Sequence, residues 1–340
     1  MNDLTPAPPS HRAGALPALG LCAALAMVGG RAAADPSELP PQYAYNYGET
    51  DTARGAGMAG AARAAGGGIH GLFYNPAGMG IARVYHIQAI GQWLPEAARQ
   101  LYGGAIVDST RRFAGGLSVI GGFQDPDGID RSQIDVRAGL AFAISSAFHI
   151  GLAGRYLALN QEGTGLLGSS RASGGLADPD DPPDGRNALV NTVSFDAGVT
   201  IKPTDEVHIA LTGQNLSYPD NGILPTTVGG AIAYATKDFT IEVDGVADFN
   251  SWVTPSPRLM AGGEYLVADA VPIRAGYRFD LMAGSHLTSS HQLSLGTGYV
   301  DPRFSLEFSV RRSVAGPSST VLVAGASFHL ESLGIPIQEY

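Results

Sequence analysis

Apolar and polar residues alternate along most of the chain after position 84, and this period of two predicts β-strands. Residues 303–311 give the clearest example, because every second side chain there is apolar: Phe304, Leu306, Phe308 and Val310. The side chains between them are polar: Ser305, Glu307, Ser309 and Arg311. Residues 133–144 and 238–249 repeat the pattern. Each such strand has one apolar and one polar face.

Fourteen runs of this kind follow one another without a helical segment between them. They occupy 84–94, 99–109, 111–121, 133–145, 147–158, 190–201, 205–216, 226–236, 238–248, 257–268, 271–281, 290–300, 303–311 and 319–330. Most have a length that suits a tilted strand crossing a bilayer, which needs about 9–11 residues. By contrast, no stretch of about 18 uncharged apolar residues follows position 34, so transmembrane helices are not expected.

The connections between the predicted strands alternate in length. Very short ones lie at Ser109-Thr110, Ser145-Ser146, Pro203-Thr204, Thr236-Lys237, Asp269-Ala270 and Asp301-Pro302. The others are longer, apart from 95–98, and the longest is 159–189. Short periplasmic turns alternating with longer external loops are typical of outer-membrane barrels. We therefore expect an all-β fold, a fourteen-stranded antiparallel transmembrane β-barrel; a soluble sandwich or propeller is the alternative.

The first 34 residues have the features of a secretory signal, with a basic Arg12, an apolar stretch and Ala32-Ala33-Ala34 at a cleavage position. The only cysteine, Cys22, would leave with this segment, which excludes disulfides and thiol chemistry in the mature chain. The mature chain would carry 19 basic and 30 acidic residues, a net charge of −11. An acidic chain does not suit a nucleic-acid partner. The predicted location is the outer membrane of a Gram-negative-type bacterium.

Residues 35–83 are rich in glycine and alanine, have no clean period, and are expected to fold inside the barrel as an N-terminal luminal plug. Within them Gly55, Gly57 and Gly60 satisfy the GxGxxG pattern of dinucleotide sites. That pattern binds phosphates only between a buried strand and a helix. Gly48-Glu-Thr-Asp-Thr-Ala-Arg54 is no hydrophobic strand, so the match is attributed to chance.

The run Ala53-Arg-Gly-Ala-Gly-Met-Ala-Gly-Ala-Ala-Arg63, followed by Gly71-Leu-Phe-Tyr-Asn-Pro-Ala-Gly78, resembles the plug of FadL-type long-chain fatty-acid transporters and their PorV-like relatives. Gly71 stands where the family pattern has alanine. The resemblance covers residues 53–81 at the level of motif and the remainder through strand count and topology. It implies passive movement of hydrophobic molecules through a barrel that its N-terminal hatch blocks.

The second part of this motif predicts a sharp turn at Asn75, Pro76, Ala77 and Gly78, because proline fixes φ and restricts the residue before it. Asn75 can bond to its own backbone there. With Gly55, Gly57 and Gly60, this turn forms the predicted plug and gate motif. Nearby apolar residues are candidates to line a ligand pocket between plug and wall: Met58, Leu72, Phe73, Tyr74 and Met79.

The polar face of the strands places charged residues in the lumen, and the main candidates are Arg137, Arg155, Asp196, Glu242, Glu264, Arg274 and Arg278. Asp135, Asp244, Asp280, Glu307 and Arg311 share that phase. Neighbouring strands offer opposite signs: Asp135 and Arg137 near Arg155 and Asp196, and Glu242 and Glu264 near Arg274 and Arg278. Cross-strand pairing is the first interpretation, and an arginine near Asn75 that receives a carboxylate head group is the second.

Enzyme and metal chemistry find little support. Asp125-Pro-Asp127-Gly-Ile-Asp130 and Asp178-Pro-Asp-Asp181 miss the spacing of calcium loops. His86, His149, His208 and His291 lack the spacing of zinc ligands. Nothing assembles a hydrolase triad, although a barrel hydrolase stays open as a third class. No enzyme activity, metal or cofactor is predicted.

The predicted organisation is a signal peptide at 1–34, a plug at 35–83, a barrel at 84–330 and a tail at 331–340. Phe328 resembles the terminal aromatic signal of barrel proteins, but ten residues follow Leu330. The predicted function is passive transport of hydrophobic small molecules, such as fatty acids, by a monomer surrounded by outer-membrane lipid. The alternative is a PorV-like barrel that binds or hands over a protein partner.

Overall fold

A computed structural model describes residues 49–125, 128–161, 164–165, 168–169, 188–217, 223–251, 254–283 and 287–330. The predicted signal peptide, the first part of the predicted plug, most of the 159–189 connection and the tail lie outside these residues. Fourteen strands form a closed barrel. They are β1 (Tyr85–Leu94), β2 (Arg99–Asp108), β3 (Phe113–Gln124), β4 (Arg131–Ala143), β5 (Phe148–Gln161), β8 (Ala188–Ile201), β9 (Val207–Gln214), β10 (Thr227–Ala235), β11 (Phe239–Asp248), β12 (Ser256–Val267), β13 (Val271–Ala283), β14 (Leu287–Val300), β15 (Phe304–Ala315) and β16 (Thr320–Leu330).

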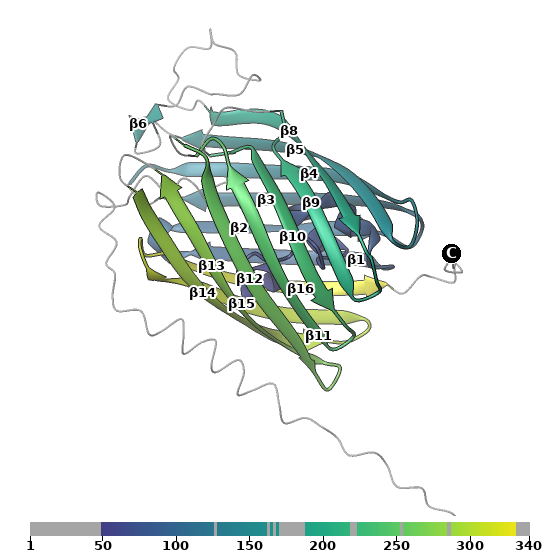
Figure 1. Ribbon diagram of the computed structural model, residues 1–340. Coiled ribbons are helices and arrows are strands. Elements are labelled where there is room, and N and C mark those ends of the chain that lie inside the picture. The colour runs from purple at the N-terminus through teal and green to yellow at the C-terminus, as the bar shows by residue number, and fades with distance from the viewer. Residues whose placement is uncertain are drawn as a thin grey trace, which may run out of the picture.

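Each strand pairs antiparallel with its neighbours along the chain, and β1 closes the barrel by pairing with β16 from Tyr85↔Leu330 to Trp93↔Leu322. A further two-stranded sheet, β6 (Thr164–Gly165) and β7 (Gly168–Ser169), lies in the connection between β5 and β8. Figure 1 shows the strands inclined to the barrel axis, with β6 beyond one end of the barrel. The prediction of a fourteen-stranded antiparallel barrel is confirmed, and every predicted strand overlaps one observed strand.

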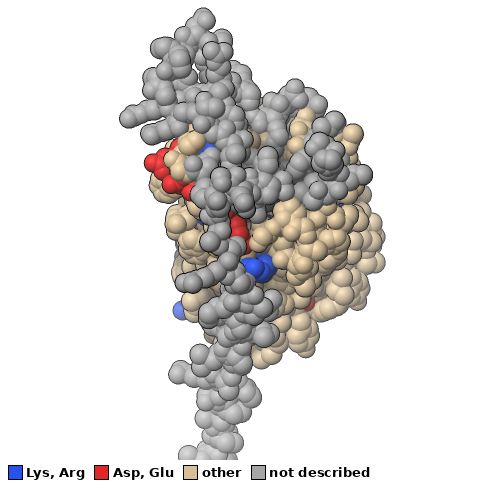
Figure 2. Space-filling view, turned by 90° about the vertical axis from the view of Figure 1, so that its left-hand side faces the viewer, with Lys and Arg blue, Asp and Glu red and all other residues tan. Residues whose placement is uncertain are grey.

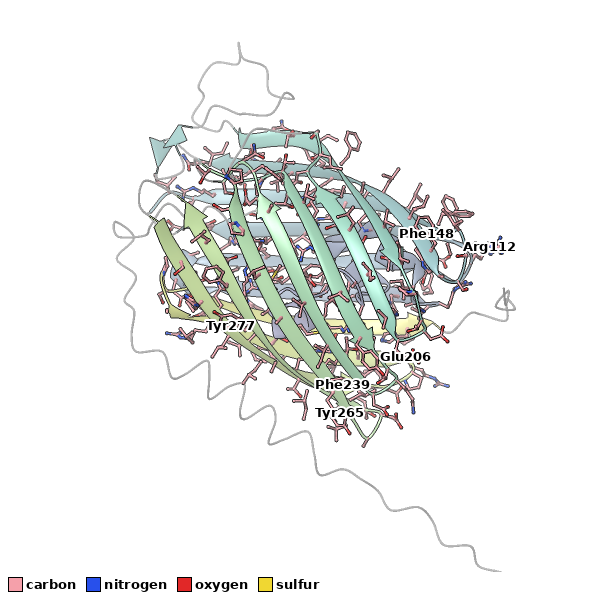
Figure 3. All side chains as sticks on the ribbon, in the orientation of Figure 1. Arg112, Phe148, Glu206, Phe239, Tyr265 and Tyr277 are labelled. Carbon is pink, nitrogen blue, oxygen red and sulfur yellow. The ribbon has the colours of Figure 1, made fainter. Side chains whose placement is uncertain are left out.

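The two ends of the barrel differ as the sequence predicts. One end, the turn end, carries the connections 109–112, 144–147, 202–206, 236–238, 268–270 and 301–303. The opposite end, the loop end, carries 95–98, 125–130, 162–187, 215–226, 249–255, 284–286 and 316–319. Arg112, Phe148 and Glu206 mark the turn end in Figure 3. Because the strand count is even, β1 starts and β16 ends at this same end.

The burial pattern of the strands assigns their two faces. On β4, for example, buried and exposed residues alternate from the buried Arg131 to the buried Ala143. The buried positions face the lumen, and the exposed positions are mainly apolar: Leu152, Leu211, Ile232, Val243 and Leu259 are 49% exposed or more. Figure 2 shows one side of the molecule, where most of the described surface is neither basic nor acidic. A barrel with polar residues inside and apolar residues outside is inverted relative to a water-soluble protein. No helix among the described residues is long and apolar enough to cross a membrane.

The described residues before β1 fill part of the lumen; we call Glu49–Arg83 the luminal segment. It contains two short α-helices, α2 (Ala53–Gly57) and α3 (Ile69–Tyr74), and the 3-10 helix η3 (Pro76–Gly80). These elements appear in purple behind the strands in Figure 1. Helix α2 contacts β13, β14, β15 and β16, whereas η3 contacts β3, β4, β5 and β8. The segment therefore reaches opposite parts of the wall, which confirms a luminal N-terminal segment.

Candidate functional site

The predicted turn at Asn75 is the best-anchored point of the luminal segment. The Asn75 side-chain oxygen accepts a hydrogen bond from Ala77 N at 3.1 Å and so caps η3, with Pro76 at its first position. The Asn75 amide nitrogen donates to Arg63 O and to Thr200 Oγ1 on β8, both at 2.8 Å. Asn75 is fully buried. One side chain thus ties together the turn, the preceding part of the segment and the wall.

Two lumen-facing glycines leave the space for this turn. A Cβ added at Gly151 on β5 would overlap the backbone of Pro76 and Ala77. A Cβ added at Gly198 on β8 would overlap the Asn75 side chain. Close backbone approach of this kind is possible only without a side chain. The wall and the turn are therefore in direct contact.

The five candidate pocket residues are buried but fall into two groups. Leu72 and Met79 pack against Gly116 and Gly139 on β3 and β4, and with Phe73 and Tyr74 they belong to one apolar cluster. Met58 packs on the other side of the lumen, against Gly262 and Gly276 of β12 and β13. Of these five residues, Phe73 and Tyr74 line a cavity of about 60 Å³, which five arginines also border. The structure does not gather the five residues around one pocket.

The glycines of the GxGxxG match serve the packing of α2. Gly55 N donates to the Thr52 hydroxyl that caps this five-residue helix, and Gly55 lies against the Tyr74 ring. Gly57 lies against Ser309 and Arg274, and Gly60 has a φ of 93°. Residues 49–52, which precede α2, form no strand. At these three positions the structure therefore shows glycine serving the cap of α2, close packing and a positive φ.

Every charged residue of the luminal segment from Glu49 to Arg63 pairs with a wall residue of opposite sign. Glu49 pairs with Arg258 and, at 3.0 Å, with Arg278. Three further pairs have N–O distances of 2.9–3.1 Å: Asp51–Arg311, Arg54–Glu264 and Arg63–Asp244. Removing one partner of a buried ion pair costs about 3–5 kcal/mol, because the other charge stays buried. These pairs anchor this half of the segment to β11, β12, β13 and β15.

Asp51 contacts both the wall and α3. Its carboxylate accepts a hydrogen bond from the Tyr74 hydroxyl at 2.8 Å and pairs with Arg311, and its backbone N–H donates to Gln92 Oε1. Burial acts to raise the pKa of Asp51, but Arg311 and the Tyr74 hydroxyl outweigh it and hold that pKa below its ordinary value. The carboxylate therefore stays ionised and links α3 to the wall.

The predicted luminal charges all lie on the inner face, and two of the predicted cross-strand pairs are confirmed. Arg155 pairs with Asp135 at 2.7 Å, and Arg274 pairs with Glu264 at 2.5 Å. Arg137 also pairs with Asp135 and lies over the Phe73 ring at 5.1 Å. Asp196 accepts from Asn215 N at 2.7 Å.

The prediction that Glu242 lies near Arg274 and Arg278 is wrong. Its carboxylate accepts hydrogen bonds from Ala64 N at 2.6 Å and Ala65 N at 3.0 Å. Arg278 instead pairs with Asp280 and Glu49. The physical reason is that buried backbone N–H groups of the luminal segment need acceptors. A cross-strand argument that considers the wall alone does not include them.

Several contributors escaped the sequence analysis because they bind the luminal segment from the wall. Ser294 donates to Gly57 O at 2.8 Å, Ser309 donates to Ala53 O at 2.5 Å, and Gln214 donates to Phe73 O at 3.1 Å. The sequence did contain one signal for these contacts, namely charged residues within a glycine-rich segment that is expected to be buried. Each buried charge requires an opposite charge on the wall. That signal points to Glu49, Asp51, Arg54 and Arg63.

The luminal segment borders a cavity on each side. Towards the loop end, the 60 Å³ cavity is lined by Glu49, Phe73 and Arg258, among others. Towards the turn end, a cavity of about 270 Å³ is lined by Arg54, His70 and the turn residues Thr236–Asp238. Among the residues that the structure describes, no three His, Cys, Asp or Glu side chains are grouped to hold a metal ion.

The seam between β8 and β9 is the shortest in the barrel wall. These strands share five pairs, from Ala197↔Gly213 to Ile201↔Ile209, whereas β2 and β3 share ten. Beyond Ala197, towards the loop end, the two strands are no longer paired, because β9 ends at Gln214 and the next residue, Asn215, has a left-handed φ of 54°. The connection after β9 replaces the ladder there, with Leu216 N donating to Phe195 O at 2.7 Å.

An apolar groove of about 950 Å³ lies on the outside of the wall over β3, β4, β5, β8, β9 and β10. Large side chains such as Leu140, Leu152 and Phe195 and small residues such as Ala197 and Gly213 line it. Gly151 and Gly198 belong to the same lining. Because the Asn75 turn packs on these two glycines from inside, it lies directly behind the groove.

The fold is that of FadL-type barrels. The chain is similar to the CymD monoaromatic hydrocarbon channel (TM-score 0.61, 14% identity, 82% of this chain and 96% of that one). It is equally similar to a Pseudomonas aeruginosa FadL homologue (TM-score 0.61, 14% identity, 82% and 98%). The Ralstonia pickettii toluene transporter TbuX follows (TM-score 0.57, 12% identity, 83% and 99%). No family model and no curated protein matches the sequence. The predicted resemblance is thus confirmed at the level of the fold.

Proposed function

We propose that this protein is an outer-membrane barrel that lets hydrophobic small molecules cross passively. The observation that carries the proposal is the position of the Asn75 turn, which lies between a closed lumen and the apolar groove on the outside of the wall. The luminal segment is buried, is held by polar contacts and lies across the barrel axis. Gly151 and Gly198 carry no side chain, so the wall between lumen and bilayer is thinnest at these two residues. Such a connection suits a molecule that dissolves in lipid.

The outer surface supports the placement in a membrane. Exposed aromatic side chains gather towards the turn end of the strands, including Phe113, Tyr234, Tyr265, Phe304 and Phe328. Phe239 and Tyr265 lie near this end in Figure 3. Towards the loop end, Tyr102, Phe123 and Phe249 are exposed. Two aromatic girdles flanking an apolar band are typical of outer-membrane barrels. We assign the turn end to the periplasm, residues 1–34 to an export signal and residues 35–83 to the plug.

Replacing Val243 by arginine tests this placement. Val243 lies in the middle of β11 and is 49% exposed, so the charge would enter the bilayer near its midplane. We expect a loss of about 2–4 kcal/mol in a lipid refolding titration. The control is Leu306→Arg, because Leu306 is also about half exposed, at 55%, but lies close to the turn end of β15. That variant should lose only about 0–1 kcal/mol. Equal losses would contradict the assigned depth.

The groove and the β8–β9 seam support a lateral path for the transported molecule. The seam has the fewest backbone pairs. Towards the loop end, Asn215 and Ser217, which follow β9, hold β8 through individual hydrogen bonds instead of a strand ladder. Fewer ladder bonds mean a lower free energy of local opening. We propose that separation of β8 from β9 connects the lumen with the groove once the Asn75 turn moves.

The substrate class is the finer part of the proposal. The similar solved structures are described as a monoaromatic hydrocarbon channel and a toluene transporter, and another as a FadL homologue. We therefore propose apolar molecules that range from aromatic hydrocarbons to fatty acids, carried by a monomeric barrel without enzymatic activity. The small polar cavity between Phe73 and the luminal arginines is compatible with a head group rather than with an apolar body.

The double variant Asn75→Ala with Pro76→Gly tests the transport function. It removes the bonds to Arg63 O and Thr200 Oγ1 and the cap of η3, and each buried group left unpaired costs about 1–3 kcal/mol. The plug should loosen, and uptake of labelled toluene or oleate by cells should rise. Asn250→Ala is the control, because Asn250 bonds to Thr226 N in a loop-end connection far from the turn.

A strain that lacks the protein gives the deciding comparison. Its uptake of both probes should fall below that of the wild type. The transport proposal fails if uptake is unchanged both in the deletion strain and in cells with the double variant. A heat-modifiability gel must show that the double variant still forms a folded barrel. The PorV-like alternative, a barrel that binds a protein partner, would then take its place.

A further inference from the structure

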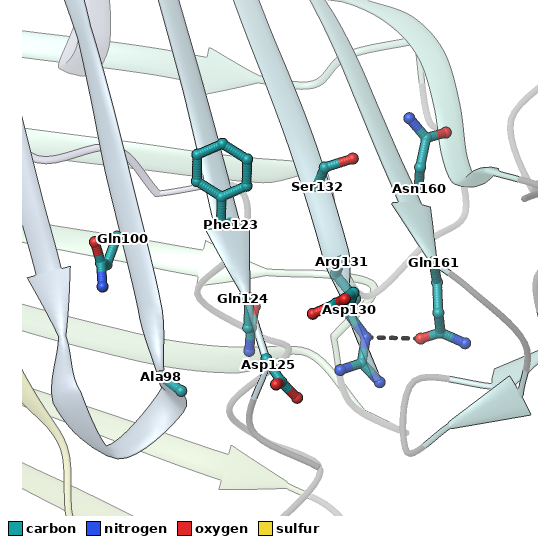
Figure 4. Close-up of a pocket in the computed structure, with 10 residues that line it drawn as sticks. All are labelled: Ala98, Gln100, Phe123, Gln124, Asp125, Asp130, Arg131, Ser132, Asn160 and Gln161. Atoms are coloured by element: carbon teal, nitrogen blue, oxygen red, sulfur yellow. Dashed lines mark hydrogen bonds between the residues drawn. The ribbon is translucent and has the colours of Figure 1, made fainter. Parts of the chain in front are cut away.

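A second large cavity lies at the loop end, away from the plug and the apolar groove. It has a volume of about 790 Å³ and is formed where β2, β3, β4 and β5 end. Its exposed lining side chains include Gln100, Phe123, Asp125, Asp130, Ser132 and Asn160. Figure 4 shows them distributed over four neighbouring strand ends and their connections. We call this cavity the rim site.

The lining of the rim site is unlike both other candidate sites. Two of its exposed side chains are amides, Gln100 and Asn160, and two are carboxylates, Asp125 and Asp130. Gln124 and Gln161 also border the cavity, but both side chains are buried. An amide both donates and accepts hydrogen bonds, whereas an ionised carboxylate accepts up to four. Such a surface places several hydrogen-bond donors and acceptors beside apolar atoms. A ligand that carries both polar groups and apolar C–H groups suits it better than a purely apolar molecule does.

One aromatic side chain completes the set. Phe123 is 68% exposed, more than any other large apolar side chain among the described residues. Phe123 belongs to the loop-end aromatic girdle and lies beside the polar groups of the cavity, so a ligand at the membrane surface can stack on its ring. A ring beside amides and carboxylates matches a pyranose, which has one face of C–H groups and an edge of hydroxyls that donate and accept.

Other ligand classes fit less well. A phosphate or another anion would meet Asp125 and Asp130, both exposed at the mouth of the cavity. The guanidinium of Arg131 is held by Gln161 at 2.7 Å, as Figure 4 shows, and also donates to Ile129 O. The guanidinium of Arg131 is therefore already hydrogen-bonded within the barrel. The carboxylates alone do not make a cation site, since no group of metal ligands occurs among the described residues.

The height of the rim site on the barrel indicates where its ligand comes from. On β2 the outward residues change from Tyr102 to Gln100 towards the loop end, and on β4 from Ile134 to Ser132. Trp93, Tyr102 and Gln100 form a chain of hydrogen bonds at this level, with distances of 2.8 and 2.7 Å. Aromatic side chains with polar tips lie at the membrane–water boundary. The site begins just above the apolar band, where the sugars of outer-leaflet glycolipids lie.

We propose that the rim site binds a saccharide, by stacking on Phe123 and by hydrogen bonds to the surrounding amides and carboxylates. This inference rests on the proposed outer-membrane orientation only for the source of the sugar, not for the binding itself. The saccharide can belong to a lipopolysaccharide in the same leaflet or to a free oligosaccharide. Both sources present the same hydroxyls and the same C–H face.

The test uses the full-length mature protein in phospholipid nanodiscs and saturation-transfer NMR. The probe is core oligosaccharide released by mild acid from rough lipopolysaccharide. We expect transfer from the protein to the C–H protons of the sugar and a roughly fivefold weaker affinity in Phe123→Ala. Phe249→Ala is the matched control, since Phe249 is also exposed near the loop end but lies at the end of β11. Asp130→Ala provides a second variant at an exposed loop position.

A second arm separates the two sources. Nanodiscs that contain rough lipopolysaccharide are compared with nanodiscs that contain a deep-rough form without core sugars, and the glycolipid retained through purification is measured. Retention that requires core sugars and Phe123 assigns the site to the membrane glycolipid. Binding of the soluble oligosaccharide alone assigns it to a free saccharide. Absence of binding in both arms, or equal binding by wild type and Phe123→Ala, overturns the proposal and leaves the transport proposal untouched.

Discussion

Replacing Gly151 by leucine is expected to displace the luminal turn and open the barrel to small solutes. The position of a new Cβ would coincide with the backbone of Pro76 and Ala77, which cannot rotate away as a flexible side chain can. Overpacking of this kind costs about 1–3 kcal/mol, and the turn, rather than the strand ladder, holds the weaker set of bonds. The strand should therefore remain in the wall while the plug moves.

The matched control for this variant is Gly154→Leu. Gly154 lies on the same strand three residues further on, and a Cβ added there meets no atom within 4 Å. Liposome swelling with a small sugar and limited proteolysis of the luminal segment measure the effect. Gly151→Leu should swell liposomes several-fold faster and expose the segment to protease. If both variants behave like the wild type, the turn does not seal the lumen.

Cross-linking β8 to β9 is expected to reduce uptake to the level of cells without the protein. Ala197 and Gly213 are the last register pair before the strands separate, and both line the apolar groove. Residues directly opposite on antiparallel strands have Cβ atoms about 4.5–5.5 Å apart, so Ala197→Cys with Gly213→Cys can be joined by a short thiol reagent. If transport requires the seam to open, the link should block it and a cleavable reagent should restore it.

The control for the cross-link is Ile106→Cys with Leu117→Cys, an outward-facing pair between β2 and β3. That seam has ten pairs and no role in the proposed path. The only native cysteine lies at position 22, within the predicted signal peptide, so a chain cleaved after that segment offers no competing thiol. Toluene uptake should persist when this control is linked. Equal inhibition by both links would argue that the molecule does not leave through β8 and β9.

The alternation of lumen-facing and lipid-facing residues on each strand shows why the barrel was predictable. On β4 and β11 the residue type alone decides which side faces lipid, since a lipid-facing charge costs several kcal/mol. A shift of one residue would invert every side chain of the strand. The pattern of Arg131–Ala143 therefore determines strand, register and face together. Chain ends and short turns then determine the order of the strands.

The luminal segment was predictable in place but not in conformation. Its glycines and its Asn75-Pro76 turn indicated a backbone in close contact with the wall, and the contacts at Gly151 and Gly198 agree with that. Its short helices carry no apolar period, because they are covered on all sides and no face is selected. Nothing local distinguishes α2 or α3 from a loop.

By itself, the sequence determined the strand count, the two faces of the wall, the difference between the barrel ends and the location of a sharp turn before β1. These features depend on neighbouring residues and on the contrast between lipid and lumen. Tertiary structure alone decided that Glu242 binds backbone amides, that Met58 and Met79 pack on opposite walls, and that β8 and β9 share the shortest seam. Each of these joins segments far apart in the chain, through packing and hydrogen bonds that local periodicity does not encode.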